Sequence, residues 1–271
     1  MTDLIEINGA AGGGQVLRTA LALSAATGRG FHICAIRGRR SRPGLRRQHL
    51  ACVRAVAQLS AAEVVGDDLG SQELVFMPHP DREEPLPEVL LCDIGSGGSV
   101  FLLLQAALFA WAARARPGQR LEVRGGTFSP LAPSAAFFLE ALLPRLNAMG
   151  WGIAAREELA AFYQTGGGRV VVEKLEAGAP AALHLTEPLG DASVSAEIAS
   201  RWLPEGVARR EAALLRERFG EALPVRLNPL PGVQGAGNAV LIRVRSACGA
   251  AVFTSIGQLG TAAEAVARNA A

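Results

Sequence analysis

Six arginines surround a Pro-Gly turn in a short stretch that ends on a Gln-His pair. The arginines are Arg37, Arg39, Arg40, Arg42, Arg46 and Arg47, and the pair is Gln48-His49. Guanidinium groups match phosphate oxygens with paired hydrogen bonds, so a polyphosphate or a nucleic-acid backbone is the natural partner of this cluster. The alternative is a solvated basic loop without a specific ligand. His49 is placed to bind phosphate or move a proton, with a helix-surface histidine as the alternative.

Three consecutive glycines at 12–14 precede an apolar helix pattern and form a second candidate phosphate site. Backbone N–H groups and the positive end of the helix dipole would face the ligand there. The glycines match neither common phosphate-binding motif, so a tight turn between closely packed backbones is an equal alternative. Arg18 lies about one turn into this helix among apolar residues. Because an unpaired guanidinium is costly to bury, Arg18 needs a neighbouring carboxylate or a bound phosphate.

Composition narrows the class of protein. The chain has 271 residues, 49% of them hydrophobic, and a net charge of +2, so any nucleic acid should contact a local patch. Four scattered cysteines are typical of a reducing, cytoplasmic protein. The four histidines lack metal-ligand spacing, which argues against a zinc site. Neither a signal peptide nor a membrane-spanning segment is expected.

The order of predicted elements indicates an α/β fold with repeated βαβα-type units. Each of two units should contain a strand, a glycine turn, an apolar helix, a second strand and a second helix. In the first unit the turn, helix, second strand and second helix are expected at 9–14, 15–27, 31–36 and 44–62, after a strand at 3–7. In the second unit they are expected at 94–99, 100–113, 121–123 and 133–148.

Three parts of the chain are predicted. Residues 1–176 form a large domain that holds the two units and the start of a third, with strands near 152–155 and 169–173. Residues 177–255 form a small inserted α/β domain, because the pattern changes to strand, charged helix and strand. Residues 256–271 return to the large domain, where the third unit is incomplete at Ala271.

Several short motifs follow one another along essentially the whole chain. They are Gly12-Gly13-Gly14-Gln15-Val16-Leu17-Arg18, Ile36-Arg37, Arg40, Pro43-Gly44-Leu45, Gln48-His49-Leu50, Ile94-Gly95-Ser96, Gly125-Gly126-Thr127, Ala132-Pro133 and Gly237-Asn238. In this order they resemble the RNA 3'-terminal phosphate cyclase family, which includes non-catalytic cyclase-like relatives. The resemblance implies a large domain of similar α/β repeats with a small inserted domain. It also implies the use of ATP and a divalent metal, manganese or magnesium, to convert an RNA 3'-phosphate into a 2',3'-cyclic phosphate through adenylylated intermediates.

The resemblance also implies a set of site residues. Those expected to grip the RNA terminal phosphate and the ATP phosphates are Arg18, Arg37, Arg40, Gln48 and His49, and RNA contact is also predicted through Arg39, Arg42, Arg46 and Arg47. Those expected near the nucleotide are Gln15, Gln105, Pro133 and Phe137. Pro133 and Phe137 would flank the adenine, although from the residues alone Phe137 is equally suited to the core. The partner is expected to be RNA with a 3'-phosphate end, and the sequence is compatible with an oligomer.

Two departures from the family pattern bear on activity. The family carries a metal-holding glutamate just before the glycines, where this chain has Asn8-Gly9-Ala10-Ala11, so the metal ligands are unknown. The family histidine that accepts AMP lies in a segment beyond Ala271, and His49 corresponds to a different histidine, so no nucleophile is assigned. The function that the resemblance implies is RNA 3'-terminal phosphate cyclisation. Because this chain lacks the glutamate and the nucleophilic histidine, the alternative is a catalytically inactive RNA-binding or ribosome-assembly protein. A small-molecule transferase is a third hypothesis, which the arginine-rich motif fits poorly.

Overall fold

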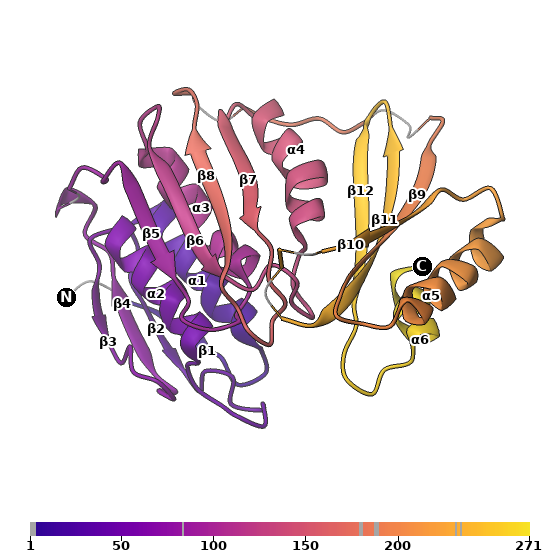
Figure 1. Cartoon of the computed structure of the whole chain (residues 1–271). Helices are drawn as coiled ribbons and strands as arrows, with labels where there is room; N and C mark the ends of the chain where they lie inside the picture. Colours follow the sequence, from indigo (N-terminus) through magenta and orange to yellow (C-terminus); the bar gives the residue numbers. More distant parts are fainter. Residues whose placement is uncertain (1–3, 83, 179–180, 187–189, 231, 234) are drawn as a thin grey trace.

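The computed structural model describes residues 4–82, 84–178, 181–186, 190–230, 232–233 and 235–271 (Figure 1). The fold is mixed α/β with repeated βα units, as predicted from the sequence. Its strands form three four-stranded sheets within these residues. None of the helices described is both long and apolar enough to cross a membrane.

The first two sheets have the same topology, which confirms the repeat. The first unit contains β1 (Ile5–Asn8), α1 (Gly14–Thr27), β2 (Phe31–Cys34), α2 (Arg47–Leu59), β3 (Glu63–Val65) and β4 (Leu74–Met77). The second contains β5 (Val89–Asp93), α3 (Val100–Arg114), β6 (Arg120–Gly125), the π-helix η2 (Phe137–Leu142), α4 (Leu143–Ala148), β7 (Ile153–Leu159) and β8 (Gly168–Lys174). The strand orders are β1-β2-β4-β3 and β5-β6-β8-β7. In both sheets the first pair is parallel and the other two pairs are antiparallel.

The strands β7 and β8 complete the second sheet, although they were expected to begin a third unit. β8 pairs with β6 from Gly125↔Gly168 to Arg120↔Glu173, and β7 then pairs with β8. The alternation in β8 leaves Val170 and Val172 buried, so this strand closes the same core as β6. The two strands therefore belong to the repeat whose helix is α3.

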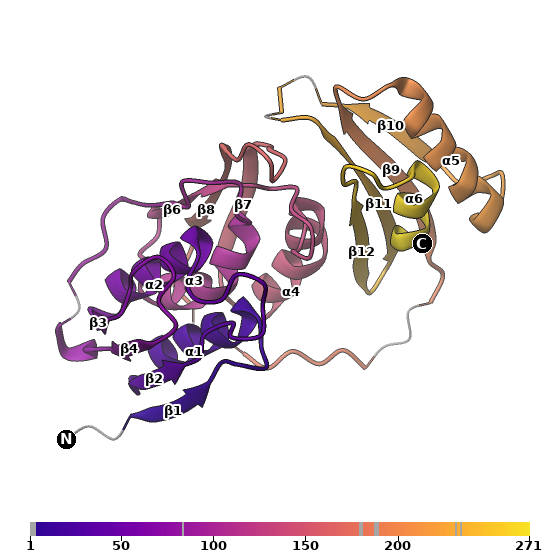
Figure 2. The same cartoon turned by 90° about the horizontal axis from the view of Figure 1, so that it is seen from below.

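Helices α1, α2 and α3 lie between the two sheets (Figure 2). α3 packs against both α1 and α2, which explains why it is apolar on nearly all sides. Ser99 caps its N-terminus: the Ser99 Oγ accepts a hydrogen bond from the Leu102 N–H at 3.4 Å. One continuous core joins the two units, with Trp111 fully buried at its centre. The glycine turn before α1 and the arginine loop before α2 are the two parts of the predicted phosphate site, and both are attached to this shared core.

The third sheet has a different topology and carries its helices on one face. Its elements are β9 (Ser193–Arg201), α5 (Glu205–Phe219), β10 (Val225–Pro229), β11 (Gly237–Ser246), β12 (Gly249–Ile256) and α6 (Ala263–Ala270), and its strand order is β10-β9-β11-β12. α6 was expected to return to the large domain, but Val266 and Ala267 pack with α5 and the third sheet. Its apolar face thus completes this smaller core.

The other face of the third sheet packs on the two-repeat part of the molecule. The rings of Phe128 and Phe162 stack with their centroids 4.9 Å apart. Both rings pack in one hydrophobic cluster with Ala199, Ala239 and Leu241 of the third sheet. Phe162 and Phe128 belong to loops beside β6 and β8, and β12 lies beside η2. The third sheet and its two helices are called the small unit below, and the rest is called the large unit.

Candidate phosphate and nucleotide site

The arginine loop between β2 and α2 is held in shape by its own backbone. Gly44 has a φ of +77°, and a Cβ on it would lie 2.1 Å from the Gly70 carbonyl oxygen, so this turn requires glycine. The Gly44 N–H donates to the Ile36 carbonyl at 2.8 Å, and the Leu45 N–H donates to the Ser71 carbonyl at 2.9 Å. Leu45 is fully buried beneath the loop. The loop is therefore held by backbone contacts with itself and with residues 70–71.

His49 is buried in the first turn of α2 and faces the start of α1. Its Nδ1 accepts a hydrogen bond from the Arg46 N–H at 3.1 Å, which leaves the proton of the neutral ring on Nε2. A Cβ on Gly14 would lie 2.3 Å from His49 Nε2, so the ring edge rests directly against the backbone of Gly14. His49 thus presents an N–H donor to the first turn of α1.

The pKa of His49 is lowered to about 4, chiefly by burial and then by nearby arginine charges, with Arg37 foremost. The ring is consequently neutral at pH 7. A neutral donor can bind a phosphate oxygen without adding charge to an already basic site. The tautomer set by Arg46 also makes Nε2 a hydrogen-bond donor rather than a nucleophile.

Arg18 lies on the first turns of α1 and is only 6% exposed. Its Nε donates to Gln105 Oε1 at 3.2 Å, and its Nη2 donates to Gln15 Oε1 at 3.0 Å. Among the ion pairs between described residues, none involves Arg18, and burial lowers the pKa of its guanidinium. The Arg18 Nη1 atom lies beside Gly14, the glycine that also contacts His49: a Cβ on Gly14 would be 2.9 Å from Nη1.

Arg40 completes the group around the start of α1. A Cβ on Gly13, the residue before the helix, would lie 3.0 Å from Arg40 Nη2. α1 has no acidic residue in its first turn and no side-chain hydrogen bond at its cap. Its backbone N–H groups and dipole therefore face the same space as the Arg18, Arg40 and His49 donors. We call these three side chains and the Gly13-Gly14 backbone the anion pocket, after the role that is proposed for them below.

The remaining arginines of the loop have other positions. Arg37 has a φ of +55° and donates from Nη1 to the Gly44 carbonyl at 2.7 Å, so it also supports the loop. Arg47 donates to the Gly95 carbonyl at 2.9 Å and thereby joins the two repeats. Arg46 is half-buried at the start of α2, next to His49. The side chains of Arg39 and Arg42 are exposed.

Gln48 and Gln105 connect the two repeats in different ways. Gln48 Oε1 accepts a hydrogen bond from the Ser99 N–H at 2.9 Å, at the start of α3. This contact turns the Gln48 carbonyl oxygen toward the second glycine turn. Gln105 on α3 accepts from Arg18, and Gln15 on α1 contacts both Arg18 and Thr19. Gln15 and Gln105 thus orient the guanidinium of the anion pocket.

A mostly apolar pocket of about 230 Å³ lies beside Gln105. It is lined by Phe101, Leu104, Gln105, Leu108, Phe109, Pro133, Phe137, Phe138 and Leu142. The structure therefore brings together three of the four residues expected near the nucleotide. Gln105 belongs to this pocket and also contacts Arg18, so it links the apolar pocket to the anion pocket. An aromatic ring and a proline beside a polar amide suit a nucleobase.

The part of the chain that the structure describes contains no group of three histidine, cysteine or carboxylate side chains suited to a metal ion. The divalent metal expected from the family resemblance stays a prediction.

The contacts within the anion pocket could not be predicted from the sequence. Gly14 was recognised only as part of a glycine turn, and its contact with His49 joins residues far apart in the chain. The signal available was the absence of a side chain at a helix start, which allows another group to approach closely. The polar contacts between η2 and the small unit were also missed, because Glu140 and Arg243 are 103 residues apart.

Replacing His49 by glutamine is expected to remove a pH-dependent part of the folding stability. The pKa of His49 in the folded state, about 4, is below the 6.5 of the unfolded chain. Neutral His49 therefore makes its full contribution to the free energy of unfolding above pH 6.5. That contribution is lost as the pH falls toward 4, because protonation then favours the unfolded chain. Between pH 7 and pH 4, wild type should lose about 3 kcal/mol of unfolding free energy relative to the variant. Urea unfolding at several pH values measures this difference.

The matched control is His184→Gln, which removes an exposed histidine of the chain. An identical loss of stability in wild type and His49→Gln would contradict the buried, neutral state assigned to His49.

The fold and the site together define an α/β protein with a cluster of basic donors at a helix start and an adjoining, mostly apolar pocket. Residues 10–258 match the family model described as "RNA 3'-terminal phosphate cyclase". A protein of that name from Ectopseudomonas mendocina is 40% identical over 99% of this chain and 77% of its own length. A second, from Salmonella typhimurium, is 39% identical over the whole chain and 79% of its own length. The chain therefore belongs to the RNA 3'-terminal phosphate cyclase family.

Proposed function

We propose that this protein is an RNA 3'-terminal phosphate cyclase, which uses ATP to convert an RNA 3'-phosphate into a 2',3'-cyclic phosphate. The observation that carries the proposal is the convergence of Arg18, Arg40 and His49 on the Gly13-Gly14 backbone. Relatives that are about 40% identical carry the cyclase name, which supports the same activity. The Arg18 guanidinium is buried and has no carboxylate partner among the residues that the structure describes, which supports a phosphate as its counter-ion.

The proposed reaction needs an activated phosphate. A phosphate monoester is a poor electrophile until one of its oxygens becomes part of a good leaving group. Transfer of AMP from ATP to the RNA 3'-phosphate releases pyrophosphate and supplies that leaving group. The neighbouring 2'-hydroxyl then attacks the terminal phosphorus, loses its proton, and AMP departs as the ring closes. The residues described here contribute binding and orientation, and no residue is assigned as an acceptor of AMP.

Each part of the site has a proposed role in this reaction. Arg18 and Arg40 would bind non-bridging oxygens of the terminal phosphate, and the Nε2 proton of His49 would bind a third oxygen. The apolar pocket with Pro133 and Phe137 would hold the adenine of ATP. Gln105 lies between the two pockets, which suits a contact near the nucleotide phosphates.

Replacing Arg40 by alanine tests the proposal. Cyclisation of a 3'-phosphorylated oligonucleotide, measured as phosphatase-resistant ends formed with ATP and manganese or magnesium, should slow by at least about tenfold, because one charged donor to the phosphate is lost. Binding of the 3'-phosphorylated oligonucleotide should weaken by about tenfold, and binding of a 3'-hydroxyl oligonucleotide should change less. Arg42→Ala, in the same exposed loop, should weaken both by the same small factor.

Equal losses for both oligonucleotides in Arg40→Ala would mean that the loop senses only the RNA backbone. A wild-type protein that prefers 3'-phosphorylated RNA but forms no cyclic ends would overturn the catalytic part of the proposal. It would favour the non-catalytic RNA-binding alternative.

A further inference from the structure

We propose that the small unit positions the nucleotide pocket through Glu140, so that contacts across the interface between the two units set the affinity for ATP. This inference rests on the proposed function, because it assigns the pocket beside Phe137 to the nucleotide. Its positioning residues lie on η2 in the large unit and on β11 and β12 in the small unit.

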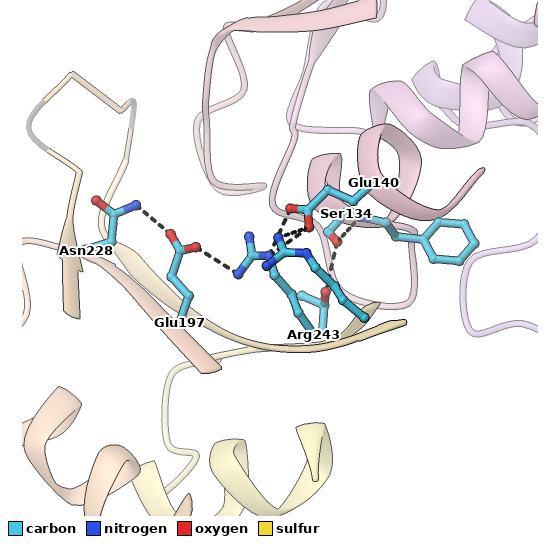
Figure 3. Close-up of polar contacts among 8 residues, drawn as sticks. Ser134, Glu140, Glu197, Asn228 and Arg243 are labelled. Carbon is cyan, nitrogen blue, oxygen red and sulfur yellow. Dashed lines mark hydrogen bonds and ion pairs between the residues drawn. The ribbon is translucent and has the colours of Figure 1, made fainter. Parts of the chain in front are cut away.

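Glu140 of the large unit takes part in an ion-pair network with arginines of the small unit (Figure 3). Its carboxylate accepts hydrogen bonds from Arg243 Nε at 2.9 and 3.1 Å and from Arg245 Nη2 at 2.5 Å. Arg243 also pairs with Glu197 at 2.9 Å, and Glu197 accepts from Asn228 at 2.6 Å. The network thus runs from η2 across three strands of the small unit.

This network is only partly shielded from solvent, since the Arg245 side chain is 52% exposed. The side chains of Arg243 and Glu197 are 13% and 15% exposed, and that of Glu140 is 27% exposed. Burial alone would raise the pKa of Glu140, but the hydrogen bonds and charges of Arg243 and Arg245 outweigh it and lower the pKa. The carboxylate is therefore ionised and held by two guanidinium groups at neutral pH.

A second set of polar contacts holds the start and the end of the same helical segment. The buried Ser134 side chain shares a hydrogen bond of 2.9 Å with Thr254 of β12 and accepts one from the Phe137 N–H at 3.2 Å. Beyond η2, Arg145 donates to the Ala250 carbonyl at 3.0 Å. The small unit therefore holds this segment at three places.

Phe137 lies between these contacts and the pocket proposed for the base. It lines the apolar pocket with Gln105, and it also lines a hollow of about 190 Å³ shared with Val252 and Thr254 of β12. η2 is a π-helix, a form that occurs mostly as short segments and frequently at functional sites. A shift of β11 or β12 would thus be passed to the ring through Ser134 and Glu140.

The test compares Glu140→Ala with the matched control Glu158→Ala. Glu158 also holds two arginines, Arg156 at 2.7 Å and Arg169 at 2.8 Å, with a similar exposure of 24%, but within the sheet of the second repeat. In Glu140→Ala, Arg243 keeps its partner Glu197, so no arginine of this pair is left buried without a carboxylate. Calorimetry would measure ATP binding, fluorescence anisotropy would measure binding of a 3'-phosphorylated oligonucleotide, and amide hydrogen exchange would follow residues 134–145.

Glu140→Ala should weaken ATP binding by about tenfold, raise exchange in residues 134–145, and leave oligonucleotide binding within about twofold of wild type. Glu140→Gln retains a hydrogen-bond acceptor, so its ATP affinity should lie between those of wild type and Glu140→Ala. Glu158→Ala should match wild type in all three measurements. Unchanged ATP affinity in Glu140→Ala, or equal losses for ATP and oligonucleotide, would overturn the positioning role while leaving the proposed function intact. Absence of ATP binding by wild type would overturn both.

Discussion

Gly14→Ala is expected to reduce the affinity for a 3'-phosphorylated oligonucleotide by about 100-fold or more. The reason is that the new methyl group would displace two phosphate donors at once, the side chains of His49 and Arg18. The new Cβ would lie 2.3 Å from His49 Nε2 and 2.9 Å from Arg18 Nη1. His49 cannot easily retreat, since it is buried and its Nδ1 is fixed by the Arg46 N–H. Fluorescence anisotropy with 3'-phosphorylated and 3'-hydroxyl oligonucleotides measures the effect.

A matched control for Gly14→Ala is Gly206→Ala, in the first turn of α5. A Cβ on Gly206 would have no atom within 4 Å, so this substitution should leave binding unchanged and favour the helix slightly. Wild-type preference for the 3'-phosphate in Gly14→Ala would show that His49 and Arg18 do not share one ligand at the start of α1.

Arg18→Met is expected to abolish the preference for a 3'-phosphate while making the protein more stable. The guanidinium is 6% exposed and has no carboxylate partner among the described residues, so its burial costs folding free energy. Methionine has a similar length and fills the space without charge, so the free energy of unfolding should rise by about 1 kcal/mol. The affinity for 3'-phosphorylated RNA should fall by about 100-fold, because a charged pair of donors is lost.

The control for this variant is Arg18→Lys. Lysine keeps the positive charge but cannot keep the contacts to Gln15 and Gln105 while donating to the ligand, so an intermediate affinity is expected. Urea unfolding and anisotropy on the same preparations separate stability from binding. A less stable Arg18→Met variant with normal phosphate preference would assign Arg18 to the fold instead of the ligand.

The repeats could be predicted from the sequence because each carries a local signal. Both contain a strand followed by a glycine turn and an apolar helix, and the helices expected at 15–27 and 100–113 match α1 and α3 closely. The boundary of the third unit could not be predicted. A strand pattern such as that of β8 does not show which strand it pairs with, and β6 is separated from it by η2, α4 and β7.

The position of α6 shows a related limit. Its buried residues, which include Val266 and Ala267, form one apolar face. From the sequence alone, such a face could pack equally well on the large domain or on the third sheet. The choice depends on the surface of α5 and the third sheet, which exists only in the folded chain. An amphipathic pattern therefore predicts that a helix packs, but it does not predict where.

The candidate site divides in the same way. The arginine loop was evident from the sequence, since six guanidinium groups in a short stretch suit an anion site or a solvated basic loop. The sequence did not separate Arg40, which approaches Gly13, from Arg37, which supports its own loop through Gly44. Gln48 contacts Ser99 across 51 residues, and no local pattern reports such a partner.

The affinity of the wild-type protein for two oligonucleotides of identical sequence, one with a 3'-phosphate and one with a 3'-hydroxyl, tests the anion pocket most directly. At several salt concentrations, the preference for the 3'-phosphate should be at least about tenfold and should persist as overall binding weakens with salt. Equal affinities at every salt concentration would contradict it, because Arg18, Arg40 and His49 would then have no terminal phosphate to recognise.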